Sequence, residues 1–394
     1  MLGALSGLRV LDFTWVLAGP FATRLLADHG AEVIKVQSRV TMEETERNIN
    51  GYFNTWNRNK LGISLNVSEP QGIELVKKLV QVSDVLVENF SPRVMKNWGL
   101  DYDTLTEVRP DLIMVSMSGM GQTGPWKDYV AFGATIQALS GITHLTTCPG
   151  KPPLGLGYSY ADQVAGLMGV LAILEALEHR RKTGEGQYID LAELESMSGL
   201  LGTALLDYQA NHRDASPIGN CSAYQPAAPH GVYRCMGEDR WCAIAVFTGE
   251  EWQAFCRVLG HPCWTMDKDF ATPLDRWRNT ARLDVLVEEW TKRHAAEEVM
   301  GLLQEVGVAA GVVQNAADLA GDPQLRSRGF FVELDHSVMG KTVSDGSLIK
   351  LGDTPAHFHR AAPLLGQDNN YIYHHLLGMS EDELEQYAAE GVIS

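Results

Sequence analysis

Asp162 is the residue whose surroundings most clearly suggest chemistry. It follows a glycine-bearing approach and immediately precedes a strongly apolar run, in the segment LGLGYSYADQVAGLMGVLAILEAL. This pattern predicts a helix over 163–181, with Asp162 as its N-cap. A helix N-terminus stabilises an ionised carboxylate as a nucleophile, and its N–H groups can bind negative charge that develops nearby. The pattern fits equally well an aspartate that only caps the helix.

Motifs for several other kinds of chemistry are missing. The first predicted strand–turn–helix contains only Gly19, so it lacks the GxGxxG fingerprint of dinucleotide binding. The run 340–342, GKT, matches the end of a P-loop, but Asp335 stands where the first glycine of that loop belongs. The sequence has no GxSxG nucleophile elbow, and its histidines lack the spacing of a zinc-binding helix. Nicotinamide chemistry, nucleotide hydrolysis and esterase chemistry are therefore not favoured, and we expect no metal.

The charge balance bears on which partners the protein can have. Its 394 residues include 32 Lys and Arg against 49 Asp and Glu, a formal net charge of −17. This balance argues against nucleic acid and against a membrane surface, because both attract basic proteins. The longest mostly apolar run, 164–177, is also shorter than the roughly 20 residues of a membrane span. A local basic pocket could still bind an anionic ligand.

The cysteines and the N-terminal segment bear on the cellular compartment. The segment MLGALSGLRVLDF lacks the basic start, apolar core and cleavage site of a signal peptide. The six cysteines include no CxxC pair and are scattered, which is typical of reduced thiols. We therefore expect a cytoplasmic protein.

Short apolar runs separated by helical patterns fill the first 120 residues. The predicted buried strands cover 9–13, 31–36, 61–65, 84–89 and 111–119. Repeated strand–helix–strand units imply a parallel, doubly wound sheet, in which ligands bind beyond the carboxyl ends of the strands. The segments to expect there are 14–20, 37–40, 89–93 and 116–121.

The pattern of the remaining residues predicts two domains. A Pro- and Gly-rich stretch after residue 211 opens a smaller α+β region, and strands and a final helix return after residue 329. We therefore predict an α/β protein with a Rossmann-like doubly wound sheet. Its large domain combines 1–210 with the C-terminal return 330–394, and a small α+β domain occupies 211–329.

Blocks of sequence along nearly the whole chain resemble one enzyme family. They include GLRVLDFTWVLAGPFATRLLADHGAEVIKV, SDVLVENFSPRVMKNWGLDYDTL, RPDLIMVSMSGMGQTGP, YADQVAG, HRRKTGEGQYIDLAELE and RAAPLLGQDN, in that order. In these blocks the chain resembles the class III CoA-transferases, the family of formyl-CoA, carnitine and benzylsuccinate CoA-transferases. α-Methylacyl-CoA racemase shares their fold. The resemblance implies that Asp162 is the covalent nucleophile, which carries CoA from a donor acyl-CoA to an acceptor acid through an aspartyl anhydride and an aspartyl-CoA thioester.

The resemblance also implies where coenzyme A, the co-substrate, would bind. Arg39 and Arg58 lie near the positions where the family places basic residues for the adenine and phosphates. The full set of predicted CoA contacts is Leu17, Ala18, Arg39, Arg58, Asn89, Phe90, Ser91, Arg93 and Lys96. For the basic residues the alternative is an ordinary solvated charge, and for Phe90 it is a place in the core.

Some positions depart from the family pattern. Leu17 stands where formyl-CoA transferase has a glutamine, and Phe132-Gly133 stands where it has a Tyr-Glu pair. The glycine-rich lid of that enzyme has no clear counterpart in 220–229, so a formyl or oxalyl substrate is not favoured. The racemase histidine is missing from DYVAFG, which favours a transferase over an acyl-CoA racemase or isomerase.

The blocks LLADHGAEVIKV, HGVYRC and GEDRWCAIAV most resemble the benzylsuccinate branch of the family. This resemblance suggests succinyl-CoA as the donor and an aromatic or dicarboxylic acid as the acceptor. Residues that could line an acid-binding pocket, or simply pack, are Tyr158, Tyr160, Tyr224 and His230. The family implies an interlocked homodimer, while some relatives pair two different subunits. A CoA-binding subunit without activity of its own is a further alternative.

Overall fold

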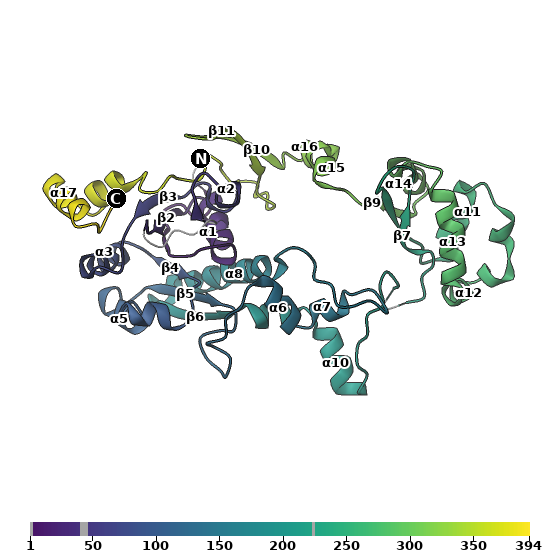
Figure 1. Cartoon of the computed structure of the whole chain (residues 1–394), viewed down its shortest axis with the longest axis horizontal. Coiled ribbons are helices and arrows are strands. Elements are labelled where there is room, and N and C mark those ends of the chain that lie inside the picture. Colours follow the sequence, from purple (N-terminus) through teal and green to yellow (C-terminus); the bar gives the residue numbers. More distant parts are fainter. Residues whose placement is uncertain (1–2, 40–45, 223–224) are drawn as a thin grey trace. The chain divides into compact units, whose positions relative to one another are not determined.

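The computed structural model describes residues 3–39, 46–222 and 225–394, which group into two compact units (Figure 1). The described residues of Met1–Thr143, Gly155–Asp214 and Gln324–Ser394 form the larger unit. His144–Leu154 and Ala215–Pro323 form the smaller one, without the masked pair at 223–224. From the sequence we expect domain boundaries after residues 210 and 329, and these boundaries stay a prediction.

The larger unit is built on a six-stranded sheet in the order β3-β2-β1-β4-β5-β6. Its strands are β1 (Arg9–Asp12), β2 (Glu32–Gln37), β3 (Leu61–Ser64), β4 (Val85–Glu88), β5 (Ile113–Ser118) and β6 (Gln187–Ala192). Every neighbouring pair is parallel, so the predicted parallel, doubly wound sheet is confirmed. The strand order reverses between β1 and β4, and the crevice beyond their carboxyl ends is the expected ligand position.

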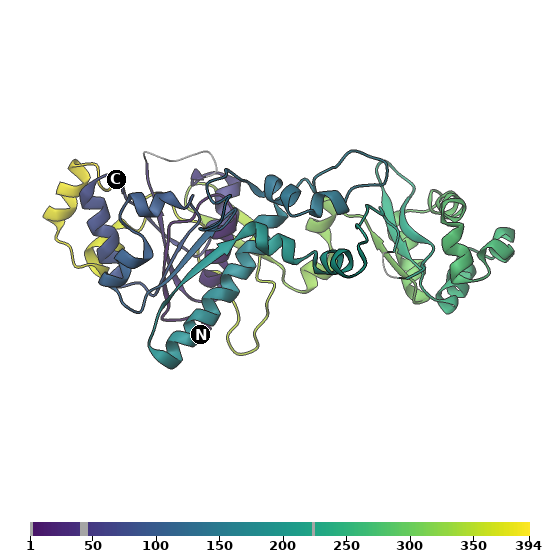
Figure 2. The ribbon, with the colours of Figure 1, turned by 90° about the horizontal axis from the view of Figure 1, so that it is seen from below.

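Helices cover both faces of this sheet because successive residues of a buried strand point to opposite sides. Val10 packs with α1 and α8, whereas Leu11 packs with α3 and α5. The helices of this unit are α1 (Ala18–Asp28), α2 (Gly51–Asn57), α3 (Pro70–Gln81), α4 (Arg93–Asn97), α5 (Tyr102–Val108), α6 (Gly133–Leu139), α8 (Tyr160–Thr183), α9 (Glu193–Gly199), α10 (Gly202–Asn211) and α17 (Glu381–Ala389). Figure 2 shows α8 lying along the sheet.

Within the described residues, α8 is the one helix whose length and composition would allow it to cross a membrane. Close to half of the most apolar stretch of α8 is buried inside the protein, and the helix packs against α1, β5 and β6. The core helix of a soluble protein meets the same criteria, because such a helix is also long and apolar.

The C-terminal residues return to the larger unit. The hairpin of β10 (Phe331–His336) and β11 (Gly340–Asp345) precedes the helical turn η4 (Asn370–Leu376) and α17. Tyr373 of η4 is fully buried in the α3–α5 core, and its hydroxyl donates to the carbonyl of Ser64 at 2.9 Å. The end of the chain therefore stabilises β3, at one edge of the sheet.

The smaller unit contains the antiparallel sheet β7-β8-β9 and a helical layer. Its strands are β7 (His230–Arg234), β8 (Trp241–Ala245) and β9 (Ala309–Val312). Its helices are α11 (Gly249–Val258), η2 (Cys263–Met266), η3 (Lys268–Phe270), α12 (Pro273–Arg278), α13 (Thr280–Thr291), α14 (Ala296–Glu305) and α15 (Ala316–Gly321). Two short helices lie where the units meet in sequence, α7 (Ile142–Leu145) and α16 (Pro323–Ser327). A separate apolar core of its own holds this unit together.

Candidate functional site

Asp162 lies in the first turn of α8, but it is not the N-cap that we predict from the sequence. The helix begins at Tyr160, and the flanking residue is Ser159. Ala161 is fully buried in a small cluster with Val164 and residues of α6 and α9, so packing starts the helix three residues earlier than the pattern of apolar residues predicts. Asp162 therefore occupies the third helical position, with its carboxylate still at the helix N-terminus.

The carboxylate of Asp162 is held in a mostly buried position and remains incompletely paired. Burial raises its pKa, while hydrogen bonds from the Ser159 hydroxyl and from the backbone N–H groups of Asp162 and Ala18 lower it. Ala18 is the first residue of α1, so the N-termini of two helices approach this carboxylate. Its Oδ2 atom is buried without a hydrogen-bond partner. A partly desolvated carboxylate oxygen with a free lone pair is suited to attack an electrophile.

Gly133, the first residue of α6, has no side chain, and the Asp162 carboxylate occupies the space that a side chain there would fill. A Cβ atom at this position would lie 2.3 Å from Oδ2 of Asp162 and 2.7 Å from Oγ of Ser159. Both distances are far below van der Waals contact. A side chain at position 133 is therefore incompatible with the observed carboxylate position.

If Asp162 is the reacting group, Gly133→Ala is expected to reduce the activity that depends on it about a hundredfold while the protein stays folded. The added methyl group meets the ends of two side chains, so the Asp162 carboxylate must rotate away from its position. The measurement is kcat beside a thermal unfolding curve. Gly199→Ala on α9, where an added Cβ meets nothing within 4 Å, is the matched control. Full activity of Gly133→Ala would show that this carboxylate position is not needed.

A buried network of charged groups fixes the turn between β1 and α1. Asp12 accepts hydrogen bonds from Lys60 Nζ at 2.9 Å, from the Thr23 hydroxyl at 2.7 Å, and from both the N–H and the hydroxyl of Thr14. Lys60 and Asp12 have no exposed side-chain surface. Lys35 donates to the carbonyl of Thr14 and pairs with Glu46. The sequence analysis missed this network, although an aspartate at the end of an apolar strand was a signal for it.

The same turn is anchored on its other side by the residue that follows β4. The side chain of Asn89 accepts from Trp15 N at 2.8 Å and donates to Trp15 O at 3.0 Å. Val16 adopts a left-handed backbone conformation, with φ of 61°, and its N–H donates to Glu46. Leu17 and Ala18 follow directly, both buried. The turn is thus held rigidly beside Asp162.

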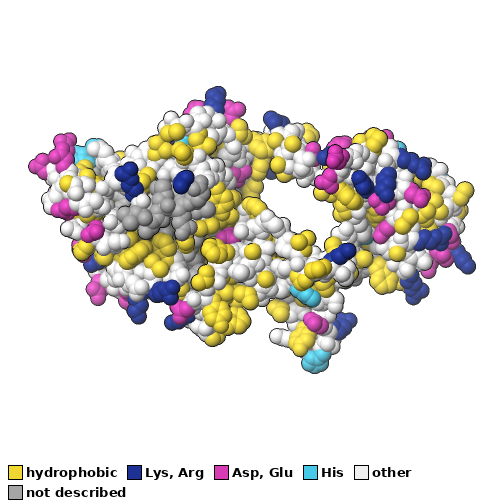
Figure 3. Space-filling view, viewed as in Figure 1, with side chains coloured by type: hydrophobic (Ala, Val, Ile, Leu, Met, Phe, Trp, Pro, Cys, Tyr) yellow, Lys and Arg dark blue, Asp and Glu magenta, His cyan; other side chains and the backbone are white. Residues whose placement is uncertain are grey.

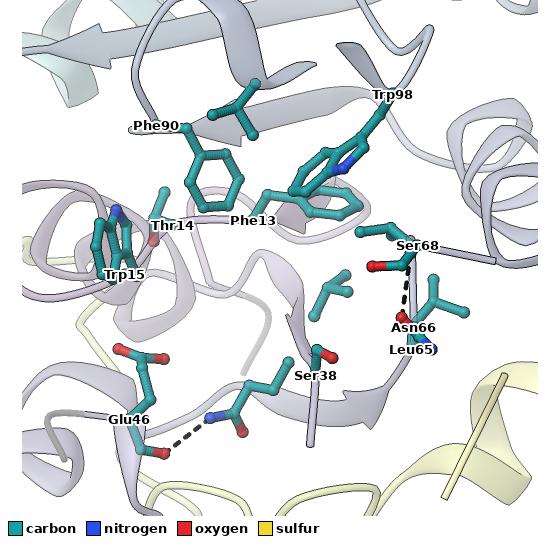
Figure 4. A pocket seen from close by; sticks show the side chains of 14 residues that line it. Phe13, Thr14, Trp15, Ser38, Glu46, Leu65, Asn66, Ser68, Phe90 and Trp98 are labelled. Carbon is teal, nitrogen blue, oxygen red and sulfur yellow. Dashed lines mark hydrogen bonds between the residues drawn. The ribbon is translucent and has the colours of Figure 1, made fainter. Parts of the chain in front are cut away.

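An aromatic cavity of about 310 Å³ opens beyond the carboxyl ends of β1 to β4. The rings of Phe90 and Trp98 meet edge to face, with centroids 5.4 Å apart, and Trp15 lies 6.4 Å from Phe90 (Figure 4). Phe13 contributes a further ring, and Glu46 and Gln37 are polar groups of the lining. This is the position that the strand order predicts for a ligand.

The predicted CoA contacts have different environments. Phe90 lines the cavity, and Asn89, Leu17 and Ala18 belong to the anchored turn beside it. The exposed residues of the set are Arg39, Ser91, Arg93 and Lys96, with the last two on α4 next to the cavity residue Val94.

Arg58 is different, because it is fully buried. Its Nη2 atom lies 2.7 Å from Asp28 Oδ2, and its Nη1 atom contacts Asp345. Its charge is balanced within the larger unit, so we leave Arg58 out of the CoA site proposed below.

The residues predicted for an acid pocket are spread over the chain. Tyr158 and Tyr160 are exposed near the start of α8, and the Tyr158 hydroxyl accepts from Gln163. His230 belongs to the smaller unit and contacts the carbonyl of Asn220. Tyr224 lies outside the described residues.

The structure adds Tyr52, which the sequence analysis missed. Burial and the Asp162 charge raise the pKa of Tyr52 to about 12, so it presents a neutral hydroxyl near the carboxylate.

Comparison with known proteins defines the family of this chain. The model of CoA-transferase family III matches residues 5–369. The chain belongs to CoA-transferase family III. It is an enzyme of the class III CoA-transferases, whose substrates are CoA thioesters. Among the described residues, no group of three or more His, Cys, Asp and Glu side chains could hold a metal ion.

Relatives in this CoA-transferase family are similar along their whole length. The succinyl-CoA–D-citramalate CoA-transferase of Chloroflexus aurantiacus is 33% identical over 99% of this chain and 98% of its own. A formyl-CoA:oxalate CoA-transferase of Rhodopseudomonas palustris is 32% identical over 100% of this chain and 98% of its own. The crystal structure of a CAIB/BAIF family protein from Brucella suis matches with a TM-score of 0.87 and 32% identity, over 95% of this chain and all of that one.

Proposed function

We propose that this CoA-transferase uses Asp162 as a covalent nucleophile and moves CoA from succinyl-CoA to a dicarboxylic or aromatic acid. The observation that carries the proposal is the Asp162 carboxylate, whose Oδ2 is buried, free of partners and given its space by Gly133. The family membership supports the same reaction class.

In the first half-reaction, the Asp162 carboxylate attacks the thioester carbonyl of the donor, and the C–S bond breaks. The products are an aspartyl mixed anhydride and CoA thiolate. The thiolate then attacks the aspartyl carbonyl of the anhydride, which releases the donor acid as its carboxylate and leaves an aspartyl-CoA thioester. The N–H of Ala18 and the N-terminus of α8 face the charge that develops on the carbonyl oxygen.

In the second half-reaction, the acceptor carboxylate attacks the aspartyl-CoA thioester and expels CoA thiolate. The thiolate attacks the acceptor carbonyl of the new anhydride, so the acceptor leaves as its CoA thioester and Asp162 is again a carboxylate. Each step exchanges one activated acyl bond for another, so no ATP is needed.

The aromatic cavity and the turn before α1 are the proposed CoA site. The rings of Phe90 and Trp98 offer flat, apolar surfaces for the adenine. Three exposed basic residues lie close in sequence to the lining residues Ser38 and Val94, and they supply charge for the phosphates on an otherwise acidic protein; they are Arg39, Arg93 and Lys96. Asn89 and Ser91 follow β4, and Leu17 and Ala18 bring the thioester end toward Asp162.

The double variant Arg93→Ala/Lys96→Ala is expected to raise KM for acyl-CoA about tenfold with little change in kcat, because two charged contacts to phosphate are lost. The check uses succinyl-CoA and its 3′-dephospho analogue. Wild-type protein should discriminate between the two, and the variant should not. Lys292→Ala, at the residue that follows α13 in the smaller unit, is the control. Unchanged discrimination in the double variant would contradict a phosphate role for α4.

The proposed donor and acceptor acids are chosen from the names of the relatives and from the positions at which this sequence differs from formyl-CoA transferase. A relative named for succinyl-CoA and D-citramalate supports succinyl-CoA as donor and a dicarboxylic acceptor. A relative named for formyl-CoA and oxalate is similarly close, but this chain has Phe132-Gly133 where formyl-CoA transferase has Tyr-Glu. The test is a panel of donors and acceptors, including formyl-CoA, citramalate, benzylsuccinate and oxalate, scored by mass spectrometry of the CoA products. Transfer confined to the formyl–oxalate pair would overturn this assignment.

We also propose that the protein forms a homodimer, interlocked as its sequence family implies, and that it resides in the cytoplasm. The chain exposes apolar side chains on helices of the larger unit that a second copy could cover. On α8 these are Leu167, Met168, Leu171 and Leu174, and on α10 they are Leu205, Leu206 and Tyr208. Figure 3 shows apolar side chains gathered at several places on the surface of the larger unit. Light scattering of the purified chain separates this proposal from a monomer, and activity of the single chain separates it from a heteromer. All six cysteines are free, in keeping with a reducing compartment.

A further inference from the structure

Residues 392–394 cover the edge of β3 that faces away from β2, where the sheet ends. The N–H of Asn66 donates to the carbonyl of Val392 at 2.8 Å. The N–H of Ser394 donates to the Ser64 hydroxyl at 2.8 Å, and this hydroxyl donates to the main-chain oxygen of Ser394 at 2.7 Å. Val392 is 1% exposed, so this segment is packed into the protein. The end of β3 is thus held by residues that are distant in the sequence.

Asn369 joins the end of β3 to this segment through its side chain. Its Oδ1 accepts from Ser64 N at 3.0 Å. Its Nδ2 donates to Ser64 Oγ at 2.9 Å and to the main-chain oxygen of Ser394 at 3.0 Å. Gly366 leaves room for this contact, because a Cβ atom there would lie 2.7 Å from the Ser394 oxygen. We call Ser64, Asn369 and Ser394 the β3 junction.

Residues next to the β3 junction line the proposed CoA site. Leu65 and Asn66 belong to the aromatic cavity, and Figure 4 shows them on the side of the cavity opposite Trp15. A second cavity of about 420 Å³ shares three lining residues with the first, so the two cavities adjoin. The lining of the second cavity consists of Ser38, Arg39, Leu65, Asn66, Ala388, Gly391, Val392, Ile393 and Ser394. The segment that holds the end of β3 is therefore also a wall of the second cavity.

The two cavities differ in chemistry, as do the two parts of the nucleotide end of CoA. The first cavity offers aromatic rings, which suit the adenine. The second has a guanidinium group, on Arg39, and the polar side chains of Ser38 and Asn66, which suit a ribose phosphate. A ligand that carries both parts fits two adjoining cavities better than either cavity alone.

We propose that residues 392–394 form a wall of the site for the nucleotide end of acyl-CoA, and that Asn369 is the positioning residue that holds this wall against β3. The inference rests on the proposed function, because it extends the CoA site described there. In this arrangement the lining residues contact the ligand, whereas Asn369 acts through its hydrogen bonds to the junction. A loose wall must be ordered when the ligand binds, which weakens binding but leaves the reacting groups at Asp162 unchanged.

The first test compares KM and kcat in Asn369→Ala, which removes three side-chain hydrogen bonds of the junction. KM for succinyl-CoA is expected to rise about fivefold, while kcat and the KM for the acceptor acid stay within about twofold of the wild type. Ser64→Ala should give the same result. The double variant should be little worse than either single variant, because both act on one junction.

The control for these variants is Asn370→Ala, which changes an exposed asparagine next in sequence to Asn369. It should keep the wild-type constants, and thermal unfolding curves of all the variants show that they are folded. An unchanged KM for succinyl-CoA in both single variants, or a loss of kcat as large as the rise in KM, would overturn the proposal.

The second test uses the unmodified protein and needs no catalysis. Hydrogen exchange is followed in the peptides that contain Asn66 and Ser394, whose amides are bonded at the wall and the junction. Bound CoA is expected to slow their exchange at least about fivefold, whereas pantetheine, which lacks the nucleotide, should leave it unchanged. Calorimetry under the same conditions measures how much CoA is bound.

Equal exchange of these peptides with and without bound CoA would contradict the proposal, and so would equal protection by pantetheine. If no donor–acceptor pair reacts, the proposed function fails, but exchange in the CoA-bound protein still decides whether residues 392–394 belong to the CoA site. A protein that binds no CoA at all would overturn both proposals.

Discussion

Asp162→Asn is expected to leave a folded protein that binds CoA but transfers it at least roughly a thousandfold more slowly. Asparagine keeps the shape of the side chain and its place in the first turn of α8, but an amide oxygen cannot form the anhydride. Because the aspartate takes part in every step of both half-reactions, no remaining group can replace it. The measurement is kcat for CoA transfer from succinyl-CoA, beside calorimetric binding of CoA.

The matched control for this variant is Glu175→Gln, which neutralises an exposed carboxylate on the same helix. It should retain wild-type kcat. Activity of Asp162→Asn within tenfold of the control would exclude Asp162 as the nucleophile, and the family reaction would then have to use another residue.

Lys60→Met is expected to destabilise the larger unit by about 3–5 kcal/mol, because it leaves the Asp12 carboxylate buried without its charge partner. Burial lowers the pKa of Lys60 to about 8, against the opposing effect of Asp12, so this lysine is itself held in an unfavourable environment. Hydrogen exchange of the β1 and α1 amides during urea unfolding measures the loss separately from the smaller unit.

The double variant Asp12→Asn/Lys60→Met provides the control for that experiment. It removes both charges and keeps an oxygen acceptor for Thr14 and Thr23, so it should recover much of the lost stability. Transfer activity should follow stability, because the same network holds the turn that leads to Ala18. If the single variant were as stable as the wild type, the buried pair would not be what fixes this turn.

The sheet could be predicted from the sequence because its strands are short apolar runs between helical segments. Runs such as RVLDF and DLIMVSMSG are buried on both sides of a parallel sheet, and a local pattern is enough to find them. The start of α8 could not be placed in the same way. It depends on the burial of Ala161 against α6 and α9, which are contacts between residues distant in sequence.

The residues of the candidate site also fall into those that the local sequence identifies and those that only the folded chain brings together. Asp162 could be selected by its position before an apolar helix and by the resemblance to a family. Gly133 and Tyr52 come from two other elements and meet the Asp162 region only in the folded chain. Arg58 is a residue that the sequence places in the site and the structure does not. It lies near an expected phosphate position in the sequence, but its charge is paired with Asp28 and Asp345.

The most direct test of the account is chemical trapping of the covalent intermediate. The protein is incubated with succinyl-CoA and hydroxylamine, digested, and its peptides are analysed by mass spectrometry. Hydroxylamine attacks an aspartyl anhydride or an aspartyl-CoA thioester and leaves an aspartyl hydroxamate, so we predict this modification on the peptide that contains Asp162. It should be absent without acyl-CoA and absent in Asp162→Asn. A protein that transfers CoA while this peptide stays unmodified, or that carries the hydroxamate at another residue, would contradict the assignment of Asp162 as the nucleophile.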